Sequence, residues 1–207
     1  MQTILIIDYG MGNIASIKKK LDLFNVNTIV SSKSEDVNAA DKIILPGIGH
    51  FGKAMANLKE YNLLDTLNEN ALIKKKPFLG ICLGMQLMNS YSEEGEEKVK
   101  GLNWFEAEVK KFTIEDKQKY KVPLIGWNKI NISKPSLLMK DIQNEAEFYF
   151  VHSYFCKCKN DNDVLNSTNH EVNFASAIEK ENLFGVQYHP EKSHEVGEQL
   201  IQNFINL

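Results

Sequence analysis

The sequence predicts an α/β protein: a mostly parallel central sheet flanked by helices, with an additional strand-rich antiparallel portion. Between residues 3 and 88, short apolar runs typical of buried strands alternate with segments of helical periodicity. Right-handed crossovers between such strand–helix units build a parallel sheet with helices on both faces. After residue 100 the pattern is mainly strand-like, which predicts the antiparallel portion.

In the first half, the apolar run at residues 3–7 predicts a strand buried on both faces. Asn13 is a candidate N-cap for the helix that follows it. This helix is indicated by apolar residues at helical spacing, namely Ile14, Ile17, Leu21 and Phe24. Further elements expected in this half are strands at 27–31, 42–45 and 77–81, one or two helices over 51–75, and a helix beginning at 85–88.

In the second half, the acidic segment 93–100 is expected to form a surface loop. Strands are then predicted at 105–112, 121–132, 147–158, 173–179 and 183–188, with a closing helix at 195–205. Because no repeat, low-complexity tract or linker interrupts the chain, residues 1–207 are predicted to form a single domain.

Composition excludes several classes of protein. With 43% hydrophobic and 25% charged residues the chain is globular, and a net charge of −3 excludes a generally basic nucleic-acid binder. No stretch has the length and apolarity of a signal peptide or a membrane span. Three cysteines are too few, and odd in number, for a disulfide framework, so a protein of the reducing cytoplasm is expected. All 24 basic residues are Lys, so a carboxylate or phosphate site would rely on backbone N–H groups, Lys or hydroxyls.

A candidate nucleophile lies in the motif Gly80-Ile81-Cys82-Leu83-Gly84, between a buried strand and a helix. Glycines at these positions permit a strained strand-to-helix turn that exposes the central side chain at the carboxyl edge of the sheet. The positive end of the following helix favours the thiolate, which is the reactive form of cysteine. The alternative for Cys82 is a small buried apolar residue, the commonest role of a free cysteine.

A candidate base and its orienting carboxylate lie near the C-terminus. His189 and Glu191 are two residues apart, so in an extended chain their side chains face the same way, and Pro190 stiffens the span. The carboxylate would hold one ring nitrogen of His189 while the other meets Cys82.

The other histidines are expected to have non-catalytic roles. His152 is expected to be hydrogen-bonded among strand side chains, and His50 to shape its glycine-rich loop. Surface positions are expected for His170 and His194. No metal site is expected, because Cys156-Lys157-Cys158 has no second pair of ligands at zinc spacing, and the two cysteines are too close along a strand to bridge each other comfortably.

The chain resembles the class I glutamine amidotransferases, whose fold is flavodoxin-like. The resemblance is carried by the strand-to-helix turn at Gly80–Gly84, hereafter the elbow, by its continuation Met85-Gln86-Leu87, and by the order Cys82, His189, Glu191. Further motifs, collinear over nearly the whole chain, resemble the glutaminase subunits of imidazole glycerol phosphate synthase. These motifs are DYGMGN at 8–13, LPGIGHF at 45–51, GWN at 126–128, YFVHSY at 149–154 and QYHPEKS at 187–193.

This resemblance implies that the chain hydrolyses L-glutamine to L-glutamate and ammonia through a Cys82–His189–Glu191 triad, without a cofactor. It also implies a heterodimer with a (β/α)₈-barrel cyclase subunit, which uses the ammonia to make imidazole glycerol phosphate and AICAR in histidine biosynthesis. Neither a nucleic acid nor a membrane is an expected partner.

Three groups of site residues follow from the resemblance. The oxyanion of each tetrahedral intermediate would be bound by backbone N–H groups of Leu83 and of the loop residues Ile48 and Gly49. Glutamine would contact Gln86, Ser153 and Tyr154. The partner subunit would contact Asn13, Trp127 and Asn128.

Two stretches depart from the pattern of the family. Leu124 stands where the family commonly has His, and Asn169-His170-Glu171 stands where a Tyr-Gly pair is usual. The first departure leaves open a related glutaminase that supplies ammonia for another metabolite, such as a surface sugar. A non-hydrolytic binding subunit is a further alternative, which the complete triad disfavours.

Overall fold

The computed structural model describes residues 1–95 and 97–207, and the larger of its two sheets contains twelve of the strands described. One half of this sheet is parallel, in the order β2-β1-β3-β4-β14. These strands are β1 (Thr3–Ile7), β2 (Asn27–Ser31), β3 (Lys42–Leu45), β4 (Phe78–Ile81) and β14 (Leu183–Val186). The order is that of a flavodoxin-like, doubly wound sheet, as the sequence predicts.

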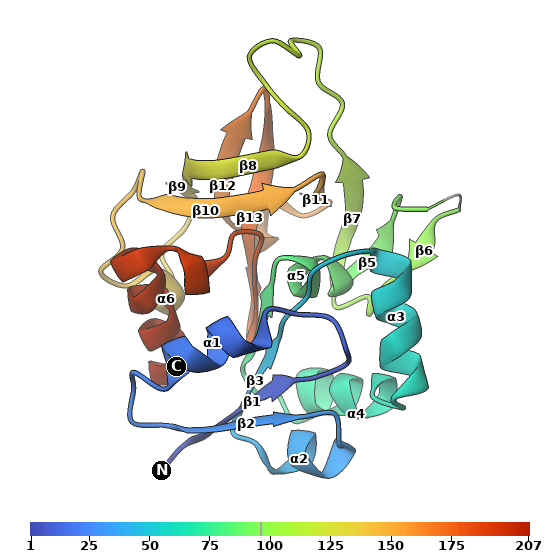
Figure 1. Ribbon diagram of the computed structural model, residues 1–207, viewed down its shortest axis with the longest axis vertical. Coiled ribbons are helices and arrows are strands. Elements are labelled where there is room, and N and C mark those ends of the chain that lie inside the picture. Colours follow the sequence, from blue (N-terminus) through green and yellow to red (C-terminus); the bar gives the residue numbers. More distant parts are fainter. Residues whose placement is uncertain (96) are drawn as a thin grey trace.

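Helices cover both faces of the parallel half (Figure 1). One face carries α1 (Ile14–Leu21) and α6 (His194–Asn206), which contact each other. The other face carries α2 (Ser34–Ala39), α3 (Phe51–Glu60), α4 (Leu64–Asn68) with its π-helical continuation Glu69–Ile73, and α5 (Leu83–Leu87).

The antiparallel half continues the same sheet from β14 through β13 (Val172–Lys180) and β11 (Tyr154–Cys158) to β7 (Phe105–Lys111). The other strands of this half are β5 (Asn89–Ser92), β6 (Val99–Lys100), β9 (Asn131–Ile132) and β12 (Val164–His170), and all pair antiparallel except β5, which is parallel to β7. A separate two-stranded sheet, formed by β8 (Leu124–Lys129) and β10 (Glu147–His152), crosses above α1 and α6 in Figure 1.

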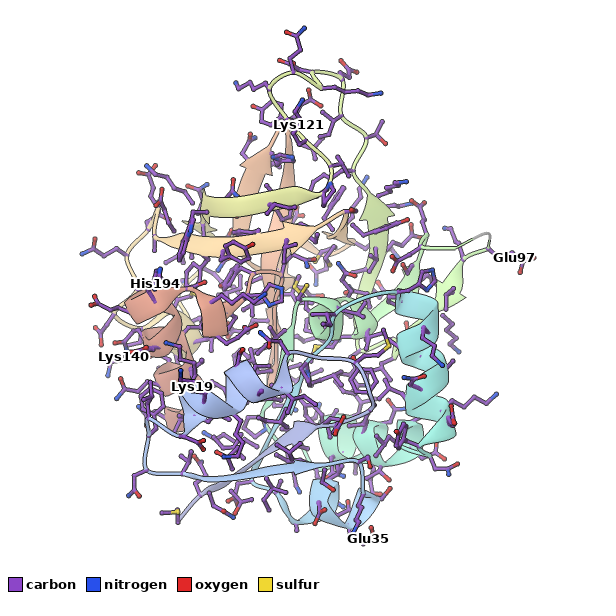
Figure 2. The ribbon with its side chains drawn as sticks, in the orientation of Figure 1. Lys19, Glu35, Glu97, Lys121, Lys140 and His194 are labelled. Atoms are coloured by element: carbon purple, nitrogen blue, oxygen red, sulfur yellow. The ribbon has the colours of Figure 1, made fainter. Side chains whose placement is uncertain are left out.

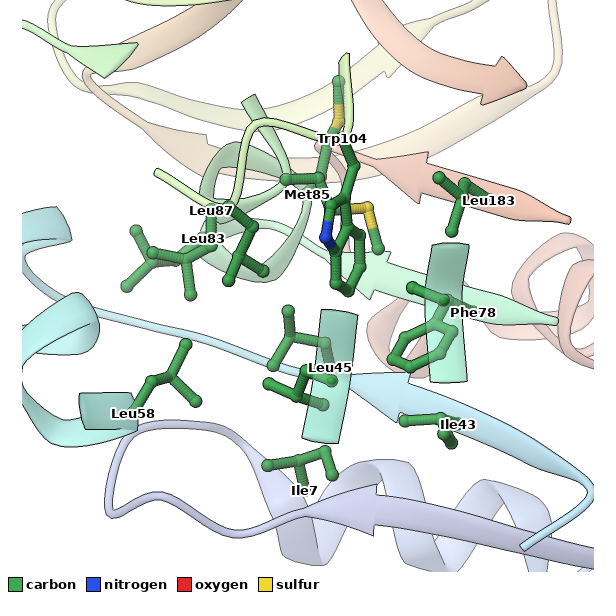
Figure 3. Close-up of a cluster of buried hydrophobic side chains, with 14 of the residues drawn as sticks. Ile7, Ile43, Leu45, Leu58, Phe78, Leu83, Met85, Leu87, Trp104 and Leu183 are labelled. Atoms are coloured by element: carbon green, nitrogen blue, oxygen red, sulfur yellow. The ribbon is translucent and has the colours of Figure 1, made fainter. Parts of the chain in front are cut away.

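The parallel strands divide their side chains between two cores because successive residues of a strand face opposite ways. In β1, Leu5 and Ile7 face α2–α5, whereas Ile4 and Ile6 face α1 and α6. Figure 3 shows the first core, in which side chains of the strands meet those of α3 and α5. The ring of Phe78 there meets that of Trp104 edge to face, with centroids 5.0 Å apart.

Two predicted strands are each divided in the structure. The segment 147–158 breaks at Ser153, so that β10 joins the small sheet and β11 the large one. The segment 121–132 starts later than predicted, at Leu124, and divides into β8 and β9. One residue in each segment therefore lets the chain change sheets, a feature that hydrophobic periodicity does not indicate.

Some elements are absent from the sequence prediction. Strand β12 has no alternating apolar pattern, because some of its buried side chains are polar. Among these, Asn166 and Thr168 each form a hydrogen bond with the buried Ser176 of β13. The prediction also lacks α2, β5 and β6, and it starts α5 two residues late. In the predicted loop 93–100, residue 96 lies outside the described residues and Val99–Lys100 form β6.

The charged residues Lys19, Glu35, Lys121 and Lys140, labelled in Figure 2, are exposed, whereas Lys42, Asp163 and Glu191 are buried. Within residues 1–95 and 97–207, no helix has both the length and the apolar character needed to cross a bilayer.

We expect Phe78→Ala to lower the free energy of unfolding by about 3–5 kcal/mol, because it leaves a cavity in a core where Phe78 is fully buried. Urea unfolding followed by fluorescence and circular dichroism measures the change. The control is Ile73→Ala, at a side chain that is 77% exposed, for which a change within about 0.5 kcal/mol is expected. Equal effects of the two substitutions would contradict this description of the core.

Candidate active site

Cys82 lies at the turn between β4 and α5, at the carboxyl edge of the parallel strands. Its backbone has φ +54° and ψ −111°, a left-handed conformation that is unusual for a residue with a side chain. Such strain persists only where the surroundings enforce it. The predicted elbow is therefore present, although Cys82 is only 6% exposed, at the wall of a cavity.

Gly84 explains how the elbow is enforced. A Cβ atom at this position would lie 1.8 Å from the carbonyl oxygen of Leu45, at the end of the neighbouring strand β3. The first turn of α5 can therefore pack directly on β3 only because residue 84 has no side chain. This contact brings the backbone of Leu83 to the loop that follows β3.

His189 and Glu191 form a buried pair: His189 Nδ1 is 2.8 Å from Glu191 Oε1. The predicted reason for their meeting is wrong, because Pro190–Lys192 form a 3₁₀ turn and not an extended span. His189 is the N-cap of this turn, and its backbone N–H donates to the carbonyl of Tyr149 in β10. The turn brings the carboxylate back to the imidazole.

The protonation of His189 depends on these neighbours. Burial of the ring lowers the pKa of His189, but interactions with Cys82 and Glu191 raise it by more, to about 9. His189 is thus an imidazolium at neutral pH. Because Nδ1 is bonded to Glu191, the interaction with Cys82 that raises the pKa acts through Nε2, which has no other partner among the described residues.

His152 differs from His189 in its environment. Burial among aromatic rings lowers the pKa of His152 to about 3, so its ring is neutral at physiological pH. Its Nδ1 donates to the carbonyl of Tyr154 over 2.7 Å, which stabilises the bend between β10 and β11. The expected structural role is compatible with this geometry, although the bond is to backbone and not to a side chain.

Two of the three predicted oxyanion donors, the backbone N–H groups of Leu83 and Ile48, are not available to a ligand in this structure. The N–H of Leu83 donates to the carbonyl of Gly47 over 3.3 Å. In a trans peptide the C=O and N–H groups point in opposite directions, so the N–H of Ile48 points away from Leu83. A rotation of the Gly47–Ile48 peptide would release the Leu83 N–H and turn the Ile48 N–H toward it. Gly49, with φ +100°, adjoins this peptide.

A cavity of about 340 Å³ lies over Cys82 and His189. Its lining includes every predicted oxyanion and substrate residue: Ile48, Gly49, Leu83, Gln86, Ser153 and Tyr154. The structure thus brings together residues from four distant parts of the sequence. Glu191 lies behind His189 and is not part of this lining.

Gln86 is less available to a ligand than the sequence suggests. Its Nε2 donates both to the carbonyl of Tyr154, over 3.0 Å, and to Gln187 Oε1, over 2.9 Å. Both amide hydrogens are therefore committed, and only Oε1 remains for a ligand. A carboxylate in this cavity would have to be recognised by other donors.

Glu94 is a cavity residue that the sequence analysis missed. It follows β5, and its Oε2 accepts a 2.7 Å hydrogen bond from the N–H of Phe51, the first residue of α3. The acidic segment that contains it was expected to be a surface loop. Only the pairing of β5 with β7 places Glu94 at the site, and local sequence carries no signal for that pairing.

The predicted partner residues do not form one exposed group. Trp127 is 43% exposed, and its indole stacks on the imidazole of His194 with centroids 5.0 Å apart. Asn128 donates to the carbonyl of Gly126. Asn13 is at the N-cap position of α1, but within the described residues its side chain caps nothing and instead donates to Glu191 Oε1 over 3.1 Å.

The two departures from the family pattern are both accommodated. Leu124 is buried in the core beneath β8, so it does not alter the exposed face on which Trp127 lies. Glu171 takes the left-handed conformation, φ +62°, that a glycine would favour. Its carboxylate is fixed by the N–H groups of Glu115 and Asp116, each over 2.8 Å.

The remaining histidines and cysteines lie outside the site. His194 is exposed, as predicted, but the predicted surface position of His170 is wrong: it is buried and its Nε2 meets the carbonyl of Lys121. His50 accepts from the N–H of Gly52 and so caps α3, within its loop as expected. Cys156 and Cys158 carry free thiols with their sulfur atoms 3.7 Å apart.

Comparisons with known proteins agree with this geometry. The profile of the family Glutamine amidotransferase class-I matches residues 5–207. Similar proteins include imidazole glycerol phosphate synthase subunit HisH 2 of Methanococcus maripaludis, which is 44% identical with 98% of each chain covered. HisH 2 of Pseudomonas aeruginosa is 41% identical with 99% of each chain covered, and HisH of Moorella thermoacetica is 42% identical with 100% of this chain and 96% of that protein covered.

Solved structures show the same fold at low sequence identity. A structure of PurLQS from Thermotoga maritima has a TM-score of 0.74 at 16% identity and covers 99% of this chain and 98% of that chain. A glutamine amidotransferase structure has a TM-score of 0.74 at 14% identity, with 98% and 97% covered. Fold, elbow geometry and close relatives together show that the chain belongs to the class I glutamine amidotransferase family, in its HisH branch.

Proposed function

We propose that this protein hydrolyses L-glutamine to L-glutamate and ammonia with Cys82 as nucleophile, as the glutaminase subunit of imidazole glycerol phosphate synthase. The observation that carries the chemistry is the elbow cysteine beside an imidazole whose other nitrogen is held by a buried carboxylate. The HisH relatives, matched over nearly their full length, support the assignment to histidine biosynthesis.

In the first half-reaction, the thiolate of Cys82 attacks the side-chain amide carbon of glutamine. His189, protonated below pH 9, gives its proton to the departing nitrogen as the C–N bond breaks. Glu191 orients the imidazole and stabilises its positive charge.

The second half-reaction needs His189 as a base. Once the sulfur is acylated, its negative charge is gone, and with it one of the interactions that raise the pKa of His189. The imidazole can then accept a proton from water as that water attacks the thioester. Glutamate is released and the thiolate is restored.

Substrate recognition in an Arg-free chain follows from the cavity lining. Glu94 and the free Oε1 of Gln86 are acceptors suited to the α-ammonium group of glutamine. We assign the α-carboxylate of glutamine to the Ser153–Tyr154 bend and Lys192, which line the cavity and carry N–H donors.

Ammonia must reach its acceptor before it is protonated in water, so a partner subunit is part of the proposal. We assign this partner as a (β/α)₈-barrel cyclase in a heterodimer, docked on the face around Trp127 and located with it in the cytoplasm. A glutaminase that serves another acceptor would keep the same triad. Reconstitution with the natural partner and identification of the aminated product distinguish the two.

Cys82→Ala and His189→Ala are each expected to abolish glutaminase activity of the complex, because each removes a group that takes part in bond breaking. Glu191→Gln is expected to leave a reduced activity, since Glu191 acts through His189. The double variant Cys82→Ala/His189→Ala should be hardly worse than either single one. The measurement is glutamate release under saturating glutamine. Full activity of His189→Ala together with complete loss in His152→Ala would reverse the assignment of the base.

We expect kcat/KM for glutamine hydrolysis to fall as the pH rises through about 9. The imidazolium that protonates the leaving nitrogen is present below the pKa of His189 and lost above it. Glu191 raises this pKa, so Glu191→Gln should move the alkaline limb of kcat/KM to lower pH. If the alkaline fall of kcat/KM occurs at the same pH in Glu191→Gln as in the unchanged chain, a group other than His189 causes it.

The isolated chain is expected to hydrolyse glutamine slowly, because the N–H of Leu83 is occupied and that of Ile48 is turned away from the site. One such donor is typically worth about 2.7–4 kcal/mol, or roughly 10²–10³ in rate. Partner and acceptor should therefore raise steady-state glutamate release by about that factor, if docking favours the rotated Gly47–Ile48 peptide. Equal rates with and without them would mean that the donors are already available.

A further inference from the structure

Behind the nucleophile lies a buried row of three amide groups. It starts at the carbonyl of Tyr154, passes through the side chain of Gln86 and ends at Gln187, whose Nε2 is 3.6 Å from the sulfur of Cys82. Gln187 is fully buried and Gln86 is 4% exposed. The resemblance to the family assigned no role to Gln187.

The hydrogen-bond pattern fixes the direction of this row. A backbone carbonyl can only accept, so Gln86 must present its amide nitrogen to Tyr154. The same nitrogen donates to Gln187, which must therefore present its oxygen to Gln86 and its nitrogen to Cys82. A flipped amide at Gln86 would place its oxygen against the carbonyl oxygen of Tyr154, and a flipped amide at Gln187 would place two NH₂ donors against each other. The sulfur of Cys82 thus receives an N–H donor.

The position of Gln187 follows from the sheet. Strands β4 and β14 are parallel neighbours in which Ile81 pairs with Val186, so the next residue of each strand, Cys82 and Gln187, lies side by side at the carboxyl edge. The N–H of Cys82 donates to the carbonyl of Val186 over 2.8 Å, which fixes this register. Gln187 is in turn held by its own N–H, which donates to Ser176 of β13.

We propose that Gln187 is a catalytic residue whose side-chain amide donates a hydrogen bond to the thiolate of Cys82, with Gln86 as the positioning residue that holds this amide in the donating orientation. The inference rests on the proposed role of Cys82 as the nucleophile. Hydrogen bonds to a charged acceptor are stronger than those to a neutral one, so this donor favours the thiolate over the thiol. It also holds the sulfur in place while the imidazolium of His189 gives its proton to the substrate nitrogen.

Gln187 and Gln86 have different parts in this proposal. Gln187 moves no proton: the sulfur lone pair forms the bond to the amide carbon, and the leaving nitrogen takes its proton from His189. After acylation the thioester sulfur is a weaker acceptor, so the donor acts mainly on the free nucleophile. Gln86 connects this donor to the bend at Tyr154, which lines the same cavity.

The test is the pH dependence of Cys82 alkylation by iodoacetamide in the full-length chain, followed by peptide mass spectrometry that separates Cys82 from Cys156 and Cys158. Gln187→Met keeps the size of the side chain and removes the donor. It is expected to raise the midpoint pH of Cys82 alkylation by roughly one to two units, the range for a hydrogen bond to a charged group. Gln86→Met, which frees the Gln187 amide to turn, should give a smaller rise.

The matched control is Gln199→Met, because Gln199 lies on α6 and bonds only to its helix neighbour Asn203 among the described residues. Its alkylation midpoint should equal that of the unchanged chain. A Gln187→Met variant that melts like the unchanged chain and has the same midpoint would overturn the proposal.

A second measurement needs no substitution at Gln187. The side-chain NH₂ resonances of Gln187 should shift with pH through the same midpoint as the alkylation, and this shift should vanish in Cys82→Ala. Resonances that do not respond to pH would overturn the proposal even if Gln187→Met fails to fold. If the shifts occur as expected but the complex releases no glutamate, the proposed glutaminase function fails and the Gln187–Cys82 interaction stands.

Discussion

The site depends on one close contact, in which the first turn of α5 packs without a side chain on the carbonyl of Leu45 at the end of β3. This contact enforces the left-handed conformation of Cys82 and so fixes the direction of the nucleophile. It also brings the Leu83 N–H to the Gly47 carbonyl. The nucleophile is therefore rigid, whereas the oxyanion donors depend on the orientation of a single peptide in an adjacent loop.

Glu191 links the triad to the N-terminal loop. Its Oε1 accepts from Asn13 and also holds the imidazole of His189, so one oxygen atom joins α1 to the base. Asn13 was expected from the family resemblance to meet the partner subunit. Its bond to Glu191 places the N-terminal loop in direct contact with the carboxylate that orients His189.

The parts of the protein that local sequence encodes could be predicted. The strand–helix alternation predicts the parallel half of the sheet, and the glycines around Cys82 predict the elbow, because both depend on neighbours in the chain. The roles of Glu94 and Gln187 depend on strand pairing between distant segments and could not be read from their surroundings in the sequence. His170 was misplaced for the same reason, since its burial depends on the loop around Tyr120 that packs over it.

We infer that catalysis requires the Gly47–Ile48 peptide to rotate away from Leu83, because its carbonyl occupies the Leu83 N–H. A crystal structure of the complex with the proposed cyclase, an acceptor analogue and a glutamine-like electrophile bound to Cys82 tests this rotation. In that complex the 3.3 Å hydrogen bond from Leu83 N to Gly47 O is expected to be broken, with the N–H groups of Leu83 and Ile48 both pointing to the oxyanion. A fully active complex that retains this hydrogen bond would contradict this inference.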